Sequence, residues 1–528
     1  MSRRPVLVLC SLALASAPAR AQNLIFDLTE PGGDQPVGSC GDLNGDGVPD
    51  FLVGAPSDHT LINNAGKVTV RSGKDGSLLY TFLGQFEHEQ LGFALDGAGD
   101  VNADGFPDVL GGDGKTLQGR ARLWSGATGA QLWEDTAGAY DFFGNAVTGV
   151  GDADFDGYDD FAVAAPQDEA FHPGAGFVRV YSGQTKGLMA TFVGDCTFAE
   201  FGVSIDGLGD VNADGLAELA VYADSAIGSC AGTVKVFTLP GGVLHTFPCD
   251  GPITLGPYGV AAAGDLDGDG LGDVVVGNSG PNFCSGSSPG NVKAYSGLSG
   301  ALLLDVDGDP GCTWLGWAVD GVGDLDGDGR DDVAVGAAGT DRVDVYSGLD
   351  QSLLLRIESP SGGNYGYGVA GLGDLDGDGS VEIAGSGVGP GAWVHSSCPG
   401  SVAPYGSGCA GSGSFVPKLA ATGCPNPGQT LMLHVTGGFG GQPAFLAFGT
   451  GEGSVPLAGA CHLLVAPWLF TASIGPLLGA GAGQGHLDVP IAVPAGTSGL
   501  TITVQEANID PPTPVRFAVS NGLRIELE

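Results

Sequence analysis

Short runs of hydrophobic residues, separated by glycine-rich or polar turns, recur through the first three quarters of the chain. In the third repeat of this pattern the runs occupy residues 145–151, 161–166, 176–183 and 188–194. Runs of this length that are rich in β-branched and aromatic residues and bounded by turns are typical of strands. The pattern therefore predicts one four-stranded antiparallel meander in each repeat, with no long helix.

The seventh repeat lacks a fourth run, because its third run at 392–396 is followed at once by Cys398. Residues 23–28 (NLIFDL) have the character of a fourth strand and precede the first repeat. We expect this N-terminal strand to complete the seventh sheet. A ring closed in this way has no open sheet edge between its first and last repeats.

One loop with the pattern GDxxxDGxxD/E lies between the first and second strands of all seven repeats, at intervals of 50 to 59 residues. Ca²⁺ takes six to eight oxygen ligands at about 2.3–2.6 Å, and short side chains at alternate positions 1, 3 and 5 of a tight loop can supply them. Glycine at position 6 accepts a positive φ without strain. Position 7 would then offer its carbonyl oxygen, and the acid at position 9 would complete the shell.

The predicted ligands at positions 1, 3, 5, 7 and 9 are Asp42, Asn44, Asp46, Val48, Asp50; Asp100, Asn102, Asp104, Phe106, Asp108; Asp152, Asp154, Asp156, Tyr158, Asp160; Asp210, Asn212, Asp214, Leu216, Glu218; Asp265, Asp267, Asp269, Leu271, Asp273; Asp324, Asp326, Asp328, Arg330, Asp332; and Asp374, Asp376, Asp378, Ser380, Glu382. An EF-hand would need Glu at position 12 between two helices. Here that position is Val or Gly, and strands are expected on both sides. A repeat of about this length forms one supersecondary unit that stacks on its neighbours, so seven loops predict seven units.

The composition agrees with a calcium-binding β-protein. The 528 residues include 97 Gly and 32 Pro and carry a formal net charge of −41. Such a charge argues against nucleic acid and anionic membranes as partners. Because crowded carboxylates repel one another unless a cation lies between them, we expect up to seven structural Ca²⁺ ions.

The N-terminus is typical of an export signal. Arg3 and Arg4 precede an apolar run, and Ala19-Arg20-Ala21 is a small-residue cleavage pattern, so residues 1–21 are predicted to be removed after Ala21. No later stretch of 18 or more apolar residues predicts a membrane span. We expect a secreted or cell-surface protein that is monomeric.

Ten cysteines remain after the export signal, an even number that favours disulfides in an oxidising compartment. Two pairs have matching places in their repeats, and we predict bridges Cys196–Cys230 and Cys249–Cys284. The pairing of the other six is left open: Cys40, Cys312, Cys398, Cys409, Cys424 and Cys461.

These features resemble the FG-GAP repeats of the integrin α-subunit β-propeller and its secreted bacterial relatives. The resemblance covers roughly residues 23–400 and rests on FG before a glycine-rich strand, on the DxDxDG loop, and on GAP-like triplets such as Gly54-Ala55-Pro56 and Ala164-Ala165-Pro166. It implies a seven-bladed β-propeller, at residues 22–401, with Ca²⁺ in the loops between strands one and two. Ligands of that family usually meet the opposite face. The aromatic of FG is replaced at Leu91, Tyr258, Leu315 and Tyr365, and integrin adhesion itself is not implied.

Residues 402–528 have a different character, with few charges and alternating runs such as LMLHVTG and LTITVQ. The strand spacing predicts a small C-terminal β-sandwich domain. It is similar to a C-terminal module of secreted bacterial proteins, for which a sorting or attachment role is a guess.

No catalytic residue is predicted. Residues 286–290 match GxSxG but lie in a loop between strands rather than on a strand–turn–helix elbow. The eight histidines show no metal-binding spacing. Asp305, Asp307 and Asp309 resemble a cation loop, but Pro310 takes the place of the turn glycine, and a solvated acidic turn is the preferred interpretation.

Several aromatic residues fall in loops expected on the face opposite the calcium loops, and exposed aromatics suit protein or glycan contacts. We single out Phe171, His172 and Trp314, while packing between repeats is the plainer interpretation of most such residues. Three functions stay open: a calcium-stabilised binding or adhesion module for protein or glycan ligands, a polysaccharide-cleaving enzyme, and a passive surface protein. The first is preferred, because no nucleophile or acid–base pair stands out.

Overall fold

The computed structural model describes residues 7–8, 24–28, 36–114, 119–138, 140–167, 174–196, 199–223, 232–239, 241–248, 259–279, 289–311, 313–326, 328–359, 362–377, 380–388, 391–397, 401–405, 416–422, 430–440, 442–456, 462–465, 468–478, 481–492, 500–509 and 517–527. The chain divides into two compact units, one comprising Leu24–Asp376 with Val381–His395 and the other comprising Met1–Asn23, Gly377–Ser380 and Ser396–Glu528. In the described part of the chain no helix is long and apolar enough to cross a membrane.

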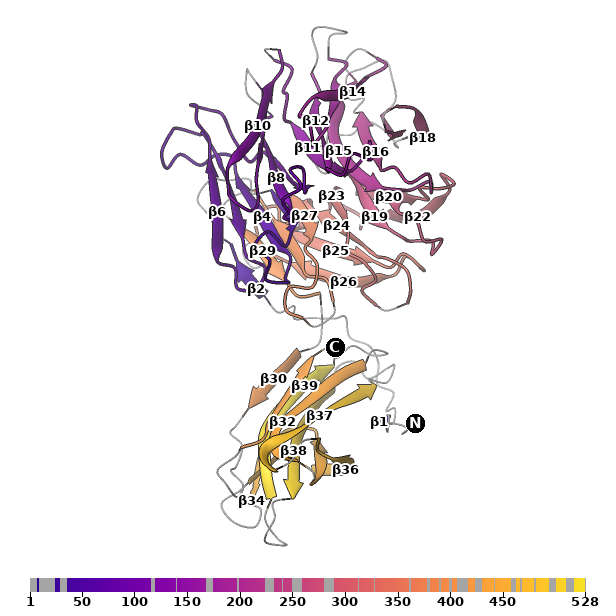
Figure 1. The fold of residues 1–528 in the computed structure, drawn as a ribbon. Helices are drawn as coiled ribbons and strands as arrows, with labels where there is room; N and C mark the ends of the chain where they lie inside the picture. The colour runs from indigo at the N-terminus through magenta and orange to yellow at the C-terminus, as the bar shows by residue number, and fades with distance from the viewer. Residues whose placement is uncertain are drawn as a thin grey trace. The chain divides into compact units, whose positions relative to one another are not determined.

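The larger unit consists of seven four-stranded antiparallel sheets, each a simple meander, as predicted (Figure 1). Blades 1 to 3 contain β3 (Val37–Gly41), β4 (Asp50–Ala55), β5 (Lys67–Arg71), β6 (Leu78–Leu83); β7 (Ala94–Gly99), β8 (Asp108–Gly112), β9 (Arg120–Trp124), β10 (Gln131–Thr136); and β11 (Ala146–Gly151), β12 (Asp160–Ala165), β13 (Phe177–Tyr181), β14 (Leu188–Val193). Blades 4 to 6 contain β15 (Phe201–Gly209), β16 (Glu218–Ala223), β17 (Thr233–Thr238), β18 (Val243–Pro248); β19 (Val260–Gly264), β20 (Asp273–Asn278), β21 (Asn291–Tyr295), β22 (Leu302–Asp307); and β23 (Leu315–Gly321), β24 (Val333–Ala337), β25 (Arg342–Tyr346), β26 (Leu353–Glu358). A 3₁₀ turn, η1 (Ala338–Thr340), joins β24 to β25.

Blade 7 contains β27 (Gly368–Gly371), β28 (Ile383–Ser386) and β29 (Ala392–His395), and its fourth strand is β2 (Leu24–Asp27). Strand β2 pairs antiparallel with β29, with Leu24 opposite His395 and Asp27 opposite Trp393. The innermost strand of every blade contacts the innermost strand of the next, including β27 with β3. The seven sheets therefore form a closed ring, and the N-terminal strand lies at the outer edge of its last blade.

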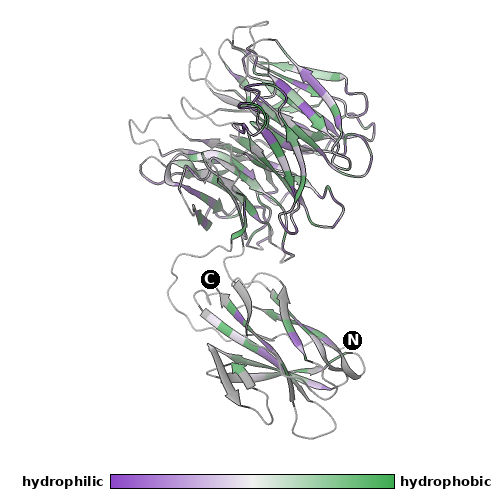
Figure 2. Cartoon of the chain, turned by 90° about the vertical axis from the view of Figure 1, so that its left-hand side faces the viewer, coloured by the Kyte–Doolittle hydropathy of each residue, from purple (hydrophilic) through white to green (hydrophobic). Residues whose placement is uncertain are grey.

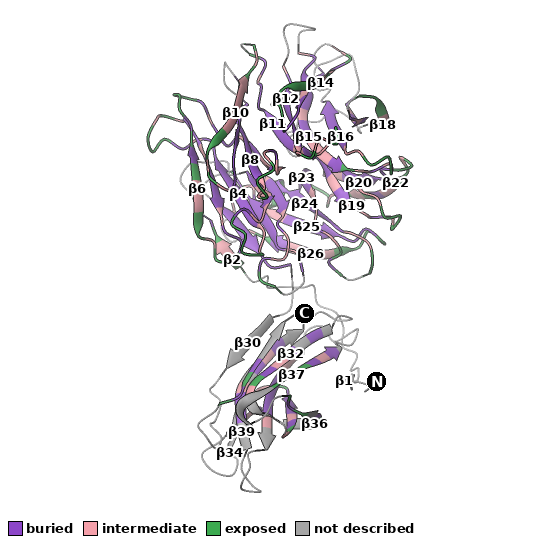
Figure 3. Ribbon diagram, in the orientation of Figure 1, coloured by how far each residue is buried: buried purple, intermediate pink, exposed green. Residues whose placement is uncertain are grey.

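The apolar core of the ring lies between successive blades. Figure 3 shows the inner strands buried and the outermost strands, such as β6 and β26, partly exposed. Figure 2 shows both hydrophobic and hydrophilic residues on the blade strands. One cluster joins Val37 and Phe51 of blade 1 to Ala370 and Val394 of blade 7, so the seam of the ring is packed like the other interfaces.

The FG and GAP glycines explain how neighbouring blades approach each other. A Cβ on Gly54 would lie 2.2 Å from the carbonyl oxygen of Gly92, and one on Gly112 would lie 2.0 Å from that of Gly144. In the FG pairs that the structure describes, the first residue is buried whether it is aromatic or aliphatic, as for Leu91 at 1% exposure. The GAP glycine of one blade thus gives room for the FG glycine of the next. Leucine can replace phenylalanine because the position needs apolar volume rather than an aromatic ring.

The smaller unit contains two sheets, as the predicted C-terminal β-sandwich requires. The first consists of β31 (Lys418–Thr422), β32 (Thr430–Gly440), β37 (Gly481–Ala492) and β1 (Leu7–Val8); the second consists of β30 (Ser401–Tyr405), β39 (Phe517–Leu527), β38 (Leu500–Ile509), β33 (Pro443–Gly449) and β36 (Trp468–Pro476). A hairpin of β34 (Glu452–Pro456) and β35 (His462–Val465) adds to them. Leu433 of β32 and Leu446 of β33 belong to one buried cluster between the sheets. The domain boundaries 1–21, 22–401 and 402–528 stay predictions.

Among the cysteines, Cys196 is disulfide-bonded. The predicted partner Cys230 and the predicted pair Cys249–Cys284 lie outside the described residues, so both pairings stay predictions. Cys40 is a free, buried thiol in the interface between blades 1 and 2.

Candidate metal loops and the axis of the ring

Each candidate loop connects the innermost strand of its blade to the second strand. The acid at position 9 is the first residue of the second strand in blades 1 to 5, where it pairs with the glycine that precedes position 1, as Asp50 does with Gly41 and Asp108 with Gly99. A register shift accompanies this pair in blades 1 to 5. The shift lets the eight residues between the pair form a compact loop at the strand end.

The carboxylate at position 1 organises the loop. In blade 1 the backbone N–H of Asp46 donates to Asp42 Oδ1 at 3.1 Å and that of Gly47 donates to Asp42 Oδ2 at 2.8 Å. The same pair of hydrogen bonds recurs in blades 2 to 6. Gly47 has a φ of 88°, with no atom within 4 Å of a hypothetical Cβ. Glycine is thus required here by conformation and not by space.

The acid at position 9 is the buried anchor of each loop. All seven are at most 1% exposed. In blade 3 the backbone N–H of Ala153 donates to Asp160 Oδ2 at 3.0 Å, and that of Gly183, in the hairpin between the third and fourth strands, donates to Oδ1 at 2.7 Å. This acid therefore joins the loop to a second hairpin of its blade.

Burial raises the pKa of six of these anchor acids, although their backbone hydrogen bonds act in the opposite direction. The pKa rises to about 7 for Asp108 and Asp332, and to about 6 for Asp160 and Asp273. Burial likewise raises the pKa of Glu218 to about 7. A cation beside these groups would favour their ionised form.

Four loops bring three carboxylates together, with one oxygen of each within 4.8 Å of the other two. The groups are Asp152, Asp154, Asp160; Asp265, Asp267, Asp269; Asp324, Asp326, Asp332; and Asp374, Asp376, Glu382. Hard carboxylate oxygens at this spacing suit Ca²⁺. The donor set therefore fits the predicted metal. Asp378 of the seventh loop lies outside the described residues.

The predicted acidic turn at Asp305, Asp307 and Asp309 is wrong as a turn, because Asp305 and Asp307 lie at exposed positions of strand β22 and Asp309 follows its end. Arg342 donates from its guanidinium to Asp309 at 2.6 Å. The guanidinium of Arg356 also lies 3.7 Å from Asp309. Asp309 therefore takes part in ion pairs with blade 6, in agreement with the interpretation that this segment is not a cation loop.

The opposite face of the ring carries the loops in which ligand-binding aromatics were predicted. Phe171 and His172 lie outside the described residues. Trp314 is partly buried and packs on Trp317, with ring centroids 5.6 Å apart. Two aromatics of the neighbouring interblade loops are more open, since Phe86 is 50% and Tyr140 is 55% exposed.

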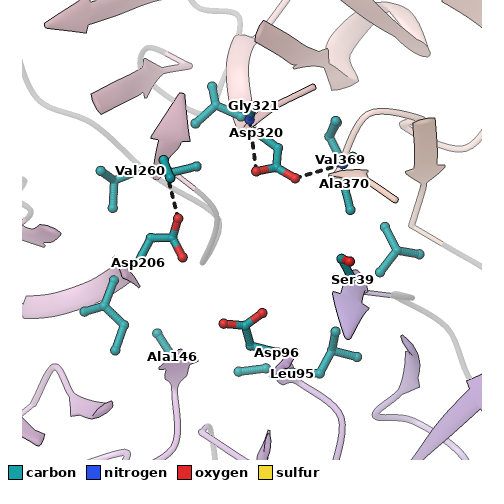
Figure 4. A pocket seen from close by; sticks show the side chains of 18 of the residues that line it. Ser39, Leu95, Asp96, Ala146, Asp206, Val260, Asp320, Gly321, Val369 and Ala370 are labelled. Carbon is teal, nitrogen blue, oxygen red and sulfur yellow. Dashed lines mark hydrogen bonds between the residues drawn. The ribbon is translucent and has the colours of Figure 1, made fainter. Parts of the chain in front are cut away.

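The axis of the ring holds a cavity of about 390 Å³ that sequence reasoning missed. Asp96, Asp206 and Asp320, from the innermost strands of blades 2, 4 and 6, point toward it (Figure 4). They occupy one position of the repeat, in the segments DGAGD (96–100), DGLGD (206–210) and DGVGD (320–324). The three segments share the pattern DGxGD, whose first Asp lies four residues before position 1 of a calcium loop. This pattern is the signal from which the axial residues could have been predicted.

Each axial carboxylate joins its own blade to the next one. Asp96 Oδ2 accepts the N–H of Gly149 at 3.2 Å, Asp206 Oδ2 accepts that of Ala262 at 2.8 Å, and Asp320 Oδ2 accepts that of Gly371 at 2.8 Å. Burial raises the pKa of all three, and that of Asp320 reaches about 8. Repulsion between Asp96 and Asp206 adds to the effect at Asp96.

The axial carboxylates predict a pH dependence of stability. Because their folded pKa values exceed the ordinary value of about 3.9, their contribution is complete below that pH and is lost as the pH rises toward and through about 8. In saturating Ca²⁺ and at constant ionic strength, we expect the Tm to fall from about pH 5 to about pH 9. The triple variant Asp96→Asn, Asp206→Asn, Asp320→Asn should show a shallower fall, measured by calorimetry. An identical slope in both proteins would contradict this assignment, whatever the offset between their Tm values.

Comparisons with known proteins agree with this architecture. The FG-GAP repeat family matches residues 37–70, which span blade 1 from β3 into β5. Integrin alpha-V of Gallus gallus is 31% identical over 206 residues, covering 35% of this chain and 19% of the relative. Integrin alpha-5 of Xenopus laevis is 30% identical over 234 residues, covering 40% and 21%, and Integrin alpha-PS2 of Drosophila melanogaster is 30% identical over 194 residues, covering 32% and 13%.

The chain thus spans about a fifth or less of the length of these curated relatives. The match to the repeat family, the seven meanders and the four acidic groups agree with one another. Taken together, they show that the chain contains an FG-GAP, integrin α-like β-propeller region.

Proposed function

We propose that the protein is a calcium-stabilised extracellular binding module that holds a protein or glycan ligand on the face of the propeller opposite the calcium loops. The observation that carries this proposal is the group of three carboxylates in four equivalent loops of an integrin α-like propeller. The same proposal includes three further expectations: an export signal that is cleaved after Ala21, a protein of the secreted bacterial type, and a monomeric state.

Calcium would act as a structural ion. Positions 1, 3, 5 and 9 of each loop would hold it by their side chains and position 7 by its carbonyl oxygen, and the ion would neutralise the charge that these groups place at one strand end. Position 9 is buried and bonded to a second hairpin, as Asp332 is through the N–H of Gly348 at 3.1 Å. An ion in the loop therefore stabilises the whole end of the blade.

The opposite face offers side chains with the right chemistry for a ligand. Phe86 is half exposed, and the guanidinium carbon of Arg120 lies 4.6 Å from its ring centroid. Half-exposed aromatic rings beside a cation suit contacts with a protein or with the apolar face of a sugar ring. A screen of glycan and protein-ligand arrays, with and without Ca²⁺, tests the proposal. Calcium-dependent capture of a ligand supports it, whereas an array without hits favours a passive surface protein.

Once a ligand is found, the variant Phe171→Ala, His172→Ala, Trp314→Ala is expected to abolish its capture, because these loop residues are predicted to contact the ligand. The Tm should fall only slightly, through the lost packing of Trp314 on Trp317. A matched control is Phe155→Ala, which removes a 67% exposed aromatic from a calcium loop on the other face. Undiminished capture by the triple variant would move the ligand site to other loops or to the C-terminal unit.

One observation favours a second candidate, a polysaccharide-cleaving enzyme. Such an enzyme needs paired acids outside the calcium loops, and Asp96, Asp206 and Asp320 are acids of this kind at a cavity. The first two also interact electrostatically, as a coupled acid–base pair would. Their hydrogen bonds across blades give them a structural role without catalysis. A screen of polysaccharides for cleavage, with Asp96→Asn as the matched variant, separates the two functions.

A further inference from the structure

The seven candidate calcium loops differ at position 3 in a way that divides them into two kinds. Loops 3, 5, 6 and 7 have Asp there and carry four side-chain carboxylates; these Asp loops are the four that form a three-carboxylate group. Loops 1, 2 and 4 have Asn and carry three carboxylates. All residues of these three Asn loops are described, and their carboxylates form no such group.

In the Asn loops the position 3 amide is bonded to the anchor acid at position 9. The amide N–H of Asn44 donates to Asp50 Oδ1 at 3.1 Å, and that of Asn102 donates to Asp108 Oδ1 at 3.1 Å. Asn212 makes the same contact with Glu218 Oε1 at 2.6 Å. The amide thus directs a donor toward the anchor acid that a cation would otherwise contact.

In the Asp loops the same place holds a second negative charge. Asp154 Oδ1 accepts the N–H of Asp156 at 3.2 Å, as Asn212 Oδ1 accepts that of Asp214 at 2.8 Å, so the two side chains sit alike in the loop. In loops 3, 6 and 7 the three-carboxylate group brings positions 3 and 9 together, as it does Asp154 and Asp160, whereas in loop 5 it brings together positions 1, 3 and 5. A cation relieves this repulsion, whereas in an Asn loop it must displace a hydrogen bond.

We propose that the propeller binds calcium in two classes, four tight sites in the Asp loops and three weaker sites in the Asn loops. The proposal rests on the calcium-binding function proposed above and concerns its order of filling. The number of ligand charges is one of the properties by which proteins set their calcium affinity. Blades 5, 6 and 7 form an unbroken arc of tight sites, so blades 1, 2 and 4 are the part of the ring that responds to the calcium concentration.

The test is a titration of the calcium-free full-length chain with Ca²⁺. Isothermal titration calorimetry, in competition with a chelator of known affinity, measures the binding. We expect four tight ions followed by three that bind roughly tenfold or more weakly. The variant Asn44→Asp, Asn102→Asp, Asn212→Asp should move all seven ions into the tight class. The reverse change Asp154→Asn should leave three tight ions and create four weak ones.

A matched control is Asn63→Asp, which adds one acid at an exposed position outside the loops. It should leave the four-to-three division unchanged. Three results would contradict the two classes of site but not the proposal of calcium binding. These are seven ions of equal affinity, tighter binding by the Asn loops than by the Asp loops, and position 3 variants that keep four tight and three weak sites. If the chain binds no calcium, both proposals are wrong. Should the triple variant fail to fold, Asp154→Asn alone decides between these outcomes.

Discussion

Removal of calcium with excess EGTA is expected to lower the Tm of the propeller by roughly 10 °C or more, which is the largest effect that we predict. A site filled at 100 times its Kd stabilises the folded state by about 2.7 kcal/mol. Four such sites together contribute about 10 kcal/mol, which is comparable to the whole stability of an ordinary domain. Differential scanning calorimetry with and without 1 mM free Ca²⁺, an order-of-magnitude choice for extracellular sites, measures the difference.

The control for this measurement is the addition of Mg²⁺ to the calcium-free protein. Mg²⁺ demands near-ideal octahedral geometry and retains its water, so it should restore little of the lost Tm. An unchanged melt in excess EGTA would show that the acidic loops need no cation. The C-terminal unit has none of the three-carboxylate groups among its described residues. Its own transition is therefore expected to stay in place.

The second large effect is expected from Gly112→Ala in β8. A Cβ at this position would lie 2.0 Å from the carbonyl oxygen of Gly144, which belongs to the FG pair of the next blade. Because the backbone fixes the positions of both atoms and no side-chain rotation can separate them, the contact can be relieved only by separating blades 2 and 3. We expect a loss of about 3 kcal/mol or more in the free energy of unfolding, measured by urea denaturation.

The matched control is Gly187→Ala in the hairpin between β13 and β14. There the nearest atom to a Cβ is the hydroxyl oxygen of Thr185 at 3.1 Å, which belongs to a side chain that can rotate away. This variant should change the free energy of unfolding by less than about 1 kcal/mol. Equal losses in the two variants would mean that the approach of the FG and GAP glycines does not determine the blade interface.

The repeated loop made much of the fold predictable. Its seven copies gave the number of blades, and the alternation of apolar runs gave the four strands of each meander. The positive φ expected at position 6 is found at Gly47, Gly105 and Gly157, among others. These features are local, because each depends on the sequence of a few adjacent residues.

Features that depend on distant parts of the chain were not predictable in the same way. Asp96 and Asp320 are separated by more than two hundred residues, and only closure of the ring brings both to one cavity. Arg122 is 1% exposed, because Glu134 of β10 and Glu89 of the loop before β7 both pair with it. A charged residue in a strand would otherwise be assigned to the surface.

For the ligand face, too, the sequence predicts local features but not the packing of each side chain. A sequence pattern can place aromatics in the interblade loops, but whether a ring is open or packed depends on its neighbours. Trp314 packs on Trp317 from the same blade, whereas Tyr140 is more than half exposed. Of the three residues singled out for this face, Phe171 and His172 lie outside the described residues, and their role stays a prediction.

A crystal structure of the chain grown in millimolar CaCl₂, with anomalous diffraction recorded at long wavelength, is the most direct test of the central claim that these loops hold calcium. The account predicts anomalous peaks in the candidate loops, each about 2.3–2.6 Å from the oxygens at positions 1, 3, 5, 7 and 9. The peaks should be strongest in blades 3, 5, 6 and 7. A well-ordered ring whose loops contain no anomalous peak at this calcium concentration would contradict it.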